Sequence, residues 1–462
     1  RAEARNENYN SRANDYLNFS ADVKASYEDW NMNGYLYVTS EEKNNLQPYN
    51  RFSAAIQNGD WLDLRLGDSY PRFPNLIMDG KRIRGVSGSL NLGTFNIQSA
   101  FGETDRKIEG SLLEVYSRDN APLRSDVIAI NEFKYSGPFG RVNLGTFKRQ
   151  IFALRPSFGS GRNFQWGLTY LHAKDDPGSI EFGARPMENI VLGTDMSFSL
   201  DDKNIQFTSQ AAFSLFNKDI SGGSLTDTQI DSIFGSGLYS DVDPSDVKNL
   251  KNILGKFITV NEFIGPLNPQ EFASLAAEAA VTFNYFNNTL RASYIYRGND
   301  YLSLGQSFIR TDVKGINIVD RIRLLDNKLF VSLGYEMLED NLQQTKIATT
   351  KYQTLSASVS IFPRINFPNI TLGYNKYDNN NSINVNDPVN GRFTVDDITD
   401  RFLVQLSYDV FLYVRHSTSF SFSTQKREDN SFAKADATFN SGTFSVNSFW
   451  TPQLSSTFQM IY

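Results

Sequence analysis

The chain has 462 residues, of which 13% are aromatic and 21% charged, and its formal net charge is −6. It contains no cysteine, which excludes disulfide frameworks and thiolate metal sites. The acidic balance argues against a nucleic-acid partner, and no apolar run approaches the ~20 residues that a membrane helix needs. These facts leave a large, aromatic-rich β-protein.

The first third of the chain contains alternating segments, and 17–28 is the clearest of them. Leu17, Phe19 and Val23 share one face of this segment, whereas Asp22 and Lys24 share the other. Such period-2 alternation predicts a strand with one apolar and one polar face. The strands predicted in this region are 16–28, 34–42, 50–58, 61–67, 81–91, 94–102, 109–118, 125–135 and 141–155.

Charged residues occur within two of these strands. Alternating leucines in 61–67 place Asp63 and Arg65 together on the opposite, polar face. Arg82 and Arg84 open the following strand. If the polar face lines a lumen, these four residues are candidates for a charged constriction. The alternative, a salt-bridge ladder that only braces the wall, fits the sequence equally well.

The rest of the chain is dominated by alternation. The predicted strands are 162–174, 188–200, 204–216, 271–286, 288–298, 310–325, 328–339, 348–362, 368–378, 397–411, 415–426, 432–440, 442–450 and 454–462. Most are longer than the ~5–6 residues typical of globular proteins and match the ~9–11 residues of a transmembrane strand. A soluble sandwich, propeller or solenoid also alternates, but the length and number of the strands favour a membrane barrel.

The connections between these strands alternate between tight and long. The tight ones are Asp201–Asn204, Phe286–Asn288, Asp326–Lys328, Pro363–Phe367, Leu412–Val414 and Asn440–Gly442. The long ones are 175–187, 217–270, 299–309, 340–347, 379–396 and 427–431. Only Thr451–Gln453 is short where a long loop is expected. Short turns on one side and long loops on the other are typical of outer-membrane barrels, as are aromatic residues beside the turns.

The segment 217–270 departs from the strand pattern. Ser224 or Thr226 can cap a short helix, and Asp243-Pro244 can open a second helix that ends at Gly255. Both helices carry apolar stripes, which must be buried against something. We expect an extracellular helical loop that forms a lid or plug for the barrel; the alternative is that the helices only cap each other above the rim.

Three acidic residues, Asp241, Asp243 and Asp246, lie close together in this segment. Such oxygen clusters suit calcium, although the full ligand series with its closing glutamate is missing. The competing interpretation makes Asp243 a helix cap and leaves the others solvated. We therefore expect no cofactor, with calcium as a weak alternative.

Catalytic motifs are not recoverable from the sequence. His172 and His416 have no recognisable nucleophile at a useful spacing, and an interfacial or turn position explains them better. The sequence therefore predicts a protein that is not an enzyme.

Two stretches resemble known families. Leu66-Gly67-Asp68-Ser69-Tyr70 followed by Arg84-Gly85-Val86 resembles a strand pair of fimbrial ushers. The pieces Asp231-Ser232-Ile233-Phe234, Tyr285-Phe286-Asn287-Asn288, Tyr301-Leu302-Ser303-Leu304-Gly305 and 320–327 resemble uncharacterised outer-membrane barrels of the Bacteroidota–Chlorobi type. The second resemblance implies a barrel fold and an outer-membrane location, and no particular activity.

Together these patterns predict one closed antiparallel transmembrane β-barrel, 1–462, of about 22 strands, with an even number from 18 to 24 tolerable. We expect it in the cell outer membrane, in contact with outer-membrane lipid and lipopolysaccharide. The predicted function is a pore or gated channel for polar solutes. The alternative is a surface-anchoring or protein-secretion component that binds protein partners at its extracellular loops.

Overall fold

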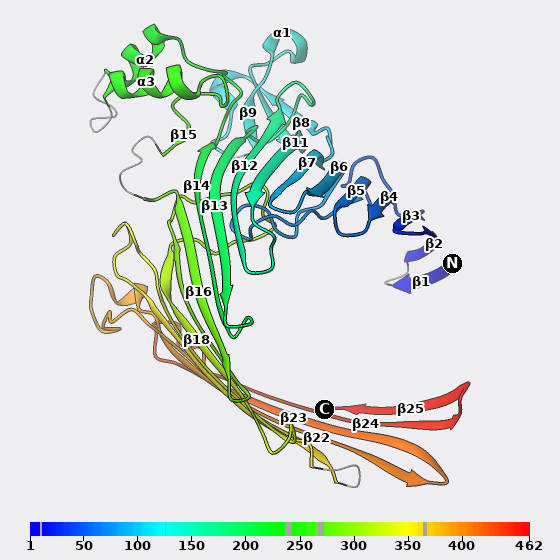
Figure 1. Ribbon diagram of the computed structural model, residues 1–462. Coiled ribbons are helices and arrows are strands. Elements are labelled where there is room, and N and C mark those ends of the chain that lie inside the picture. Colours follow the sequence, from blue (N-terminus) through cyan, green and yellow to red (C-terminus); the bar gives the residue numbers. More distant parts are fainter. Residues whose placement is uncertain (10–11, 125, 236–242, 267–271, 364–366) are drawn as a thin grey trace. The chain divides into compact units, whose positions relative to one another are not determined.

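The computed structural model describes residues 1–9, 12–124, 126–235, 243–266, 272–363 and 367–462. Within these residues, the strands form one 22-stranded sheet and a separate three-stranded sheet (Figure 1). Successive strands of the large sheet pair in antiparallel fashion, as the β2–β3 and β22–β23 ladders show. The all-β antiparallel class and the predicted strand number are thereby confirmed.

The strands of the large sheet have the following bounds. They are β1 Ala2–Tyr9, β2 Arg12–Tyr27, β3 Trp30–Thr39, β4 Arg51–Asn58, β5 Leu62–Ser69, β6 Ile83–Asn91, β7 Phe95–Asp105, β11 Lys148–Phe158, β12 Phe164–Asp176, β13 Glu188–Leu200, β14 Ile205–Asn217, β15 Ile264–Gly265, β16 Leu275–Tyr285, β17 Asn288–Arg297, β18 Val313–Leu324, β19 Leu329–Glu339, β20 Lys351–Ile361, β21 Asn369–Asn380, β22 Asp396–Leu412, β23 Val414–Asp429, β24 Ala437–Thr451 and β25 Leu454–Ile461.

The chain forms two compact units. The first comprises Arg1–Met196, Gln210–Leu275 and Asp300–Ile309, and the second comprises Ser197–Ser209, Ala276–Asn299 and Arg310–Tyr462. The cavity, the buried core cluster and the helical insertion described below belong to the first unit.

A continuous apolar row crosses one face of the second unit. Directly paired residues carry it over eight strands: Leu324, Leu329, Ile361, Ile370, Leu406, Phe420, Phe444 and Met460. The neighbouring row, on the other face, is Ser360, Thr371, Gln405, Ser421 and Thr443. Side chains of the apolar row such as Phe420 and Met460 are 40% and 58% exposed, and so wide an exposed apolar surface suits lipid rather than water.

The first unit repeats this arrangement. Paired residues Ala54, Leu66, Val86, Phe101 and Phe152 form an apolar row across β4, β5, β6, β7 and β11. We call the face of each unit that carries its apolar row the lipid face, and the opposite face the lumenal face. The sequence alternation predicted both faces correctly, because successive strand residues point to opposite sides.

The tight turns expose apolar side chains. Phe286 and Asn287 form a two-residue turn with φ of 52° and 59°, which matches the twist of an antiparallel hairpin. Phe286 is 97% exposed, and Phe411 and Tyr413 at another tight turn are 78% and 106% exposed. Aromatic rings at this level suit the headgroup region at one membrane surface.

Two predicted strands, 432–440 and 442–450, are in fact one. β24 runs from Ala437 to Thr451 and stays paired with β23 through Ser441 and Gly442. The turn predicted at Asn440–Gly442 was therefore wrong, because turn-forming residues are tolerated in a strand that a neighbour pairs. Because 432–450 contains one strand rather than two, the alternation of tight and long connections shifts by one. A tight turn is then expected at Thr451–Gln453, where the structure has it.

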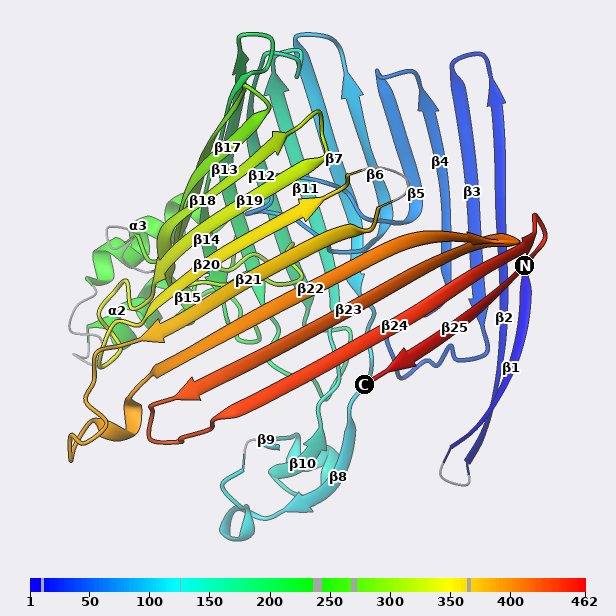
Figure 2. The ribbon, with the colours of Figure 1, turned by 90° about the horizontal axis from the view of Figure 1, so that it is seen from below.

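The predicted strands 109–118 and 125–135 do not belong to the large sheet. The segment 106–147 instead forms a surface module with strands β8 Ser111–Tyr116, β9 Val127–Ala129 and β10 Phe139–Asn143, the 3-10 turn Arg118–Asn120 and the helix α1 Glu132–Tyr135. Its three-stranded sheet has the order β8-β10-β9 and connects the ends of β7 and β11 (Figure 2). Local alternation cannot tell which sheet a strand joins.

The insertion after β14 contains the two predicted helices, α2 Asp227–Phe234 and α3 Pro244–Leu254. Thr226 caps α2 in a capping box with Gln229, and Asp243 caps α3, whose first residue is proline. Gly255 ends α3. Among the described residues, no helix is long and apolar enough to span a membrane.

Candidate lumenal site

The lumenal face of β2 to β7 surrounds a cavity of about 780 Å³. Serine, asparagine and glutamine side chains make up much of its wall. Its charged members are Lys24, Asp63, Arg65, Asp68 and Arg72. Tyr70 adds an aromatic surface. The wall of this cavity is therefore largely hydrophilic.

Asp63 and Arg65 lie side by side in this wall, as the sequence predicts. The Arg65 Nε and Nη2 donate to the two Asp63 carboxylate oxygens at 3.0 and 2.9 Å. Gln57 on the neighbouring strand also donates to Asp63, at 3.0 Å. The Arg65 side chain is 45% exposed, so the pair presents charge to the cavity.

Arg82 and Arg84 do not contact this pair but gather around Asp68, which also lines the cavity. The Arg84 Nε and Nη2 donate to the Asp68 carboxylate at 3.1 and 3.0 Å, and the Arg82 Nε lies 3.7 Å from it. The guanidinium of Arg84 also covers the Phe52 ring at 4.9 Å. The four predicted residues thus form two separate groups, and their role in a constriction stays a prediction.

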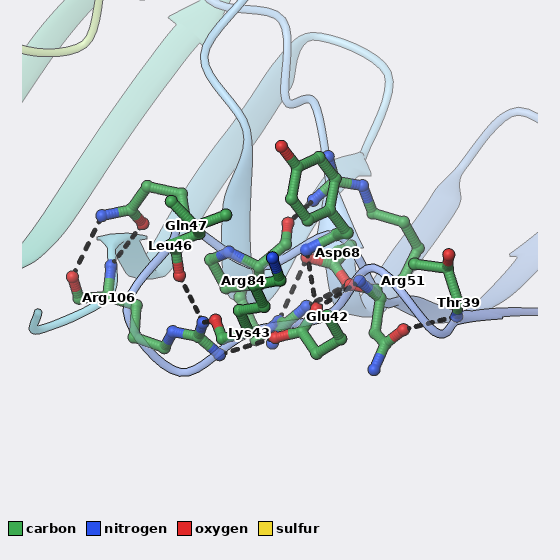
Figure 3. Close-up of polar contacts among 12 residues, drawn as sticks. Thr39, Glu42, Lys43, Leu46, Gln47, Arg51, Asp68, Arg84 and Arg106 are labelled. Atoms are coloured by element: carbon green, nitrogen blue, oxygen red, sulfur yellow. Dashed lines mark hydrogen bonds and ion pairs between the residues drawn. The ribbon is translucent and has the colours of Figure 1, made fainter. Parts of the chain in front are cut away.

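The Asp68 group anchors the loop 40–50, which connects β3 to β4 (Figure 3). Arg84 donates to the carbonyl of Asn50 at 2.8 Å, and Arg82 donates to that of Pro48 at 3.1 Å. On the far side of the loop, Arg106 donates to Glu42 at 2.7 Å. Arginine therefore holds both sides of this loop.

Glu42 accepts hydrogen bonds from both ends of this network. Burial alone raises the pKa of its carboxyl, but hydrogen bonds from the backbone of Asn50 and Tyr49 and from Arg106 outweigh burial and lower the pKa below its ordinary 4.5. The two backbone N–H groups donate to Glu42 Oε2 at 2.8 Å. The loop thus depends on an ionised carboxylate.

Two connections, 70–82 and 300–309, fold onto the lumenal face. We call them the lumenal segments. The Tyr301 hydroxyl donates to the carbonyl of Leu76 at 2.5 Å, and the Ser303 hydroxyl donates to that of Ile77 at 2.5 Å. Leu76, Ile77 and Tyr301 are each 1% exposed, so the two segments are firmly packed.

The lumenal segments cover an unusual part of the wall. Here the lumenal face is apolar: Ile151, Ala153, Leu171 and Val191 are 0–1% exposed. Ile77 lies against Gly193, where an added Cβ would come within 2.5 Å of the Ile77 Cδ1. The sequence carried two signals for this arrangement. Apolar residues on both faces of β11 to β14 indicated that a segment covers the lumenal face. The apolar run 76–78, between Pro74 and Gly80, indicated a segment that could cover it.

The sequence did not predict one ion pair on the lumenal face. Arg155 on β11 donates to both carboxylate oxygens of Asp195 on β13, at 2.9 and 2.5 Å, and to Gln98 on β7 at 3.0 Å. The two charged side chains are 9% and 19% exposed. Residues 40 positions apart gave no local signal.

The helical insertion packs on the lipid face. Ile230 of α2 and Val247 of α3 are buried in one cluster with Ile190 of β13 and Leu215 of β14, both of which point away from the lumenal segments. The helices lie beside the ends of these strands (Figure 1). The predicted role as lid or plug stays a prediction; the cover observed on the lumenal face comes from the lumenal segments.

The calcium hypothesis gains no support from its described members. Asp243 accepts a hydrogen bond from the Ser245 N–H at 2.8 Å as the α3 cap, and this bond lowers the pKa of its carboxyl. Asp241 lies outside the described residues. In the part of the chain that the structure describes, no group of three metal-binding side chains is assembled.

Both histidines have structural partners. The His172 Nε2 lies 2.9 Å from the Glu188 carboxylate, and the His416 Nδ1 lies 2.8 Å from the Ser448 hydroxyl. His416 also meets the Trp450 ring edge-on at 6.2 Å, next to a tight turn. That position agrees with the interfacial interpretation.

No protein-family model and no curated protein matches the chain. Several solved structures are similar to it at low identity. The crystal structure of OccAB2 from Acinetobacter baumannii is 11% identical with a TM-score of 0.38, covering 81% of this chain and 89% of that chain. BauA, the ferric preacinetobactin receptor of the same organism, is 9% identical with a TM-score of 0.46, covering 96% and 72%.

A further similar structure is the Escherichia coli P pilus tip assembly intermediate PapC-PapD-PapK-PapG. It is 10% identical with a TM-score of 0.42, covering 100% of this chain and 58% of that chain.

The structure defines the class of protein. The strands are long and antiparallel, and an exposed apolar row crosses each unit. Tight turns with aromatic residues lie at one end of the strands and long connections at the other. These are the properties of a transmembrane β-barrel of the bacterial outer membrane.

Proposed function

We propose that the protein is an outer-membrane pore for small polar solutes, narrowed on its lumenal side. The observation that carries this proposal is the polar cavity of about 780 Å³ beside the Asp63–Arg65 pair. Hydroxyl, amide and paired charged groups can exchange hydrogen bonds with a passing solute without holding it tightly. The lumenal segments cover part of the lumenal face of the first unit.

Ion selectivity in planar bilayers tests this proposal. Arg65→Gln removes a positive charge from the wall and should shift the reversal potential in a salt gradient toward cation selectivity; Asp63→Asn should shift it toward anions. Arg124→Gln is the matched control, since Arg124 and Asp126 form the same two-residue pair at 2.8 and 2.9 Å on the surface module. Unchanged selectivity in both cavity variants would contradict the proposal.

Protein binding is the alternative function, and the surface module favours it. This module is fixed to the connection 175–187 by Lys134 and Tyr135, which donate to Glu181 at 2.6 and 2.7 Å. An exposed module that is held in place at the long-loop end suits a protein partner. A barrel that conducts no ions and co-purifies with protein from detergent would support this alternative.

We also propose kinship with the Bacteroidota–Chlorobi barrels. The support is the sequence pieces quoted above, of which Tyr301–Gly305 belongs to a lumenal segment. A conserved Tyr301 and Ser303 in such barrels would support the kinship, because both side chains hold the lumenal segments together.

A further inference from the structure

The helical insertion, 218–266, leaves several large apolar side chains uncovered. Ile253 near the end of α3, Phe257 after it and Phe263 are 70%, 56% and 37% exposed. Their neighbours Leu254, Ile258 and Ile264 pack in the cluster described above. The insertion therefore has an inner apolar side that is buried, and further apolar side chains that remain exposed.

The insertion lies at the boundary of the lipid face. Ile190 of β13 is 4% exposed under the insertion, whereas Leu192, two residues further along the same face, is 50% exposed. On β12, Tyr170 packs against the cluster, and Leu168 and Trp166 on the same face are 46% and 38% exposed. The lipid-exposed wall therefore begins directly where the insertion ends.

A hydrogen bond to Glu188 fixes the insertion at this boundary of the lipid face. The Glu188 side chain, 1% exposed, accepts the Thr259 N–H at 2.8 Å and lies 3.1 Å from the Lys174 Nζ. Phe257 and Ile258 immediately precede Thr259, so this bond sets their height on the wall. A carboxylate buried with these partners is costly to detach.

Cationic side chains accompany the exposed apolar ones. The Arg185 guanidinium covers the Phe263 ring at 5.8 Å. Its Nε lies 3.7 Å from the Asp219 carboxylate, and its side chain is still 71% exposed. Lys256 precedes Phe257 and is exposed. Apolar groups beside lysine and arginine are the composition of elements that lie in a membrane interface, where anionic headgroups meet the acyl chains.

We propose that the helical insertion is an interfacial membrane anchor, which places Ile253 and Phe257 at the boundary between headgroups and acyl chains of the outer leaflet. The partner is the lipid surface, because the insertion continues the lipid face at its edge. This inference rests on the barrel class and is independent of the proposed solute pathway.

The absence of cysteine allows a direct test on the full chain. Single-cysteine variants Phe257→Cys and Ile253→Cys are labelled with the fluorophore NBD. The protein is reconstituted into vesicles of phosphatidylcholine and anionic phosphatidylglycerol that contain nitroxide-labelled lipid. Leu192→Cys on the wall is the positive control. Leu123→Cys, in the surface module and 106% exposed, is the negative control. All four side chains are exposed, so none of the substitutions opens a core cavity.

The proposal predicts loss of NBD fluorescence at 257 and 253 with headgroup nitroxides, a stronger loss at 192 with acyl-chain nitroxides, and none at 123. Fluorescence at 257 that resists both quenchers, as at 123, would overturn it. A blue-shifted but unquenched label at 257 would also overturn it, because it would place a protein surface there. Channel conductance does not enter this readout, so the solute-pore proposal can fail separately.

Discussion

Leu406 shows how a single side chain can test the assignment of the two faces. It belongs to the exposed apolar row, between Ile370 and Phe420, while its sequence neighbours Gln405 and Ser407 point to the polar, lumenal face. The assignment of these residues depends on strand register, since a slip of one residue would exchange the two faces.

We expect Leu406→Arg to impair barrel assembly, because a lipid-facing arginine near the bilayer midplane costs ~2–4 kcal/mol. Gln405→Arg and Ser407→Arg should assemble normally, since the charge would face the lumen. Heat-modifiable gel mobility and the urea midpoint in lipid measure the difference. Normal assembly of Leu406→Arg together with failure of its neighbours would place the register one residue away.

Glu42 gives a pH prediction at the same scale. Its folded-state pKa is below the unfolded value of 4.5, so its stabilisation of the loop is fully present above about pH 4.5 and is lost as the pH falls through the folded pKa. Hydrogen-exchange protection of the Tyr49 and Asn50 amides should therefore fall on acidification. Glu42→Gln should lower this protection already at neutral pH.

Glu41→Gln serves as the control for this experiment, because Glu41 is the exposed neighbour of Glu42. It should leave the protection of both amides unchanged. Equal protection in the Glu42→Gln variant would mean that the arginines, and not this carboxylate, hold the loop.

Among the elements, the helical insertion depends most on a small core. Ile230 is fully buried between α2, α3 and the wall, and ion pairs from Lys248 to Asp231 and from Lys251 to Asp227 connect the two helices at 2.6 and 2.7 Å. Two helices of this length are not stable alone in water, so the contact with the wall decides whether they persist.

We expect Ile230→Ala to destabilise the insertion by about 2–5 kcal/mol, through lost burial and the cavity left behind. Trypsin should then cut 218–266 faster while the strands remain intact. Ile253→Ala, at a position 70% exposed, should leave the cleavage rate in detergent unchanged. Equal rates for both variants would contradict the core described for the insertion.

At the scale of the whole molecule, the proposed pore function can be tested through the segments that cover each face. The lumenal segments cover the lumenal face, and the insertion packs on the lipid face. Each arrangement predicts a different response of conductance to mutation.

We expect Ile77→Asp to increase single-channel conductance, because a buried unpaired carboxylate costs several kcal/mol and should release the segment from Gly193. Ile77→Val, which keeps an apolar contact, should conduct like the original chain. Deletion of 219–266 with a short Gly/Ser linker should leave conductance nearly unchanged, whereas a large rise on this deletion would support the lid hypothesis.

The sequence by itself determined most of the strands, their two faces, most of the tight turns and the caps of α2 and α3. These features follow from period-2 and helical spacing and from turn and cap chemistry, which act over a few residues. Asp63 and Arg65 were found for the same reason: one strand places both on one face.

Only the tertiary structure decided which surface each connection covers and which sheet each strand joins. Arg155 meets Asp195 and Tyr301 meets Leu76 across 40 and 225 positions, and 106–147 forms its own sheet. A local sequence pattern shows that an apolar run will be buried. It does not show which face of the sheet the run will cover. The choice depends on side chains that folding brings together from distant parts of the chain.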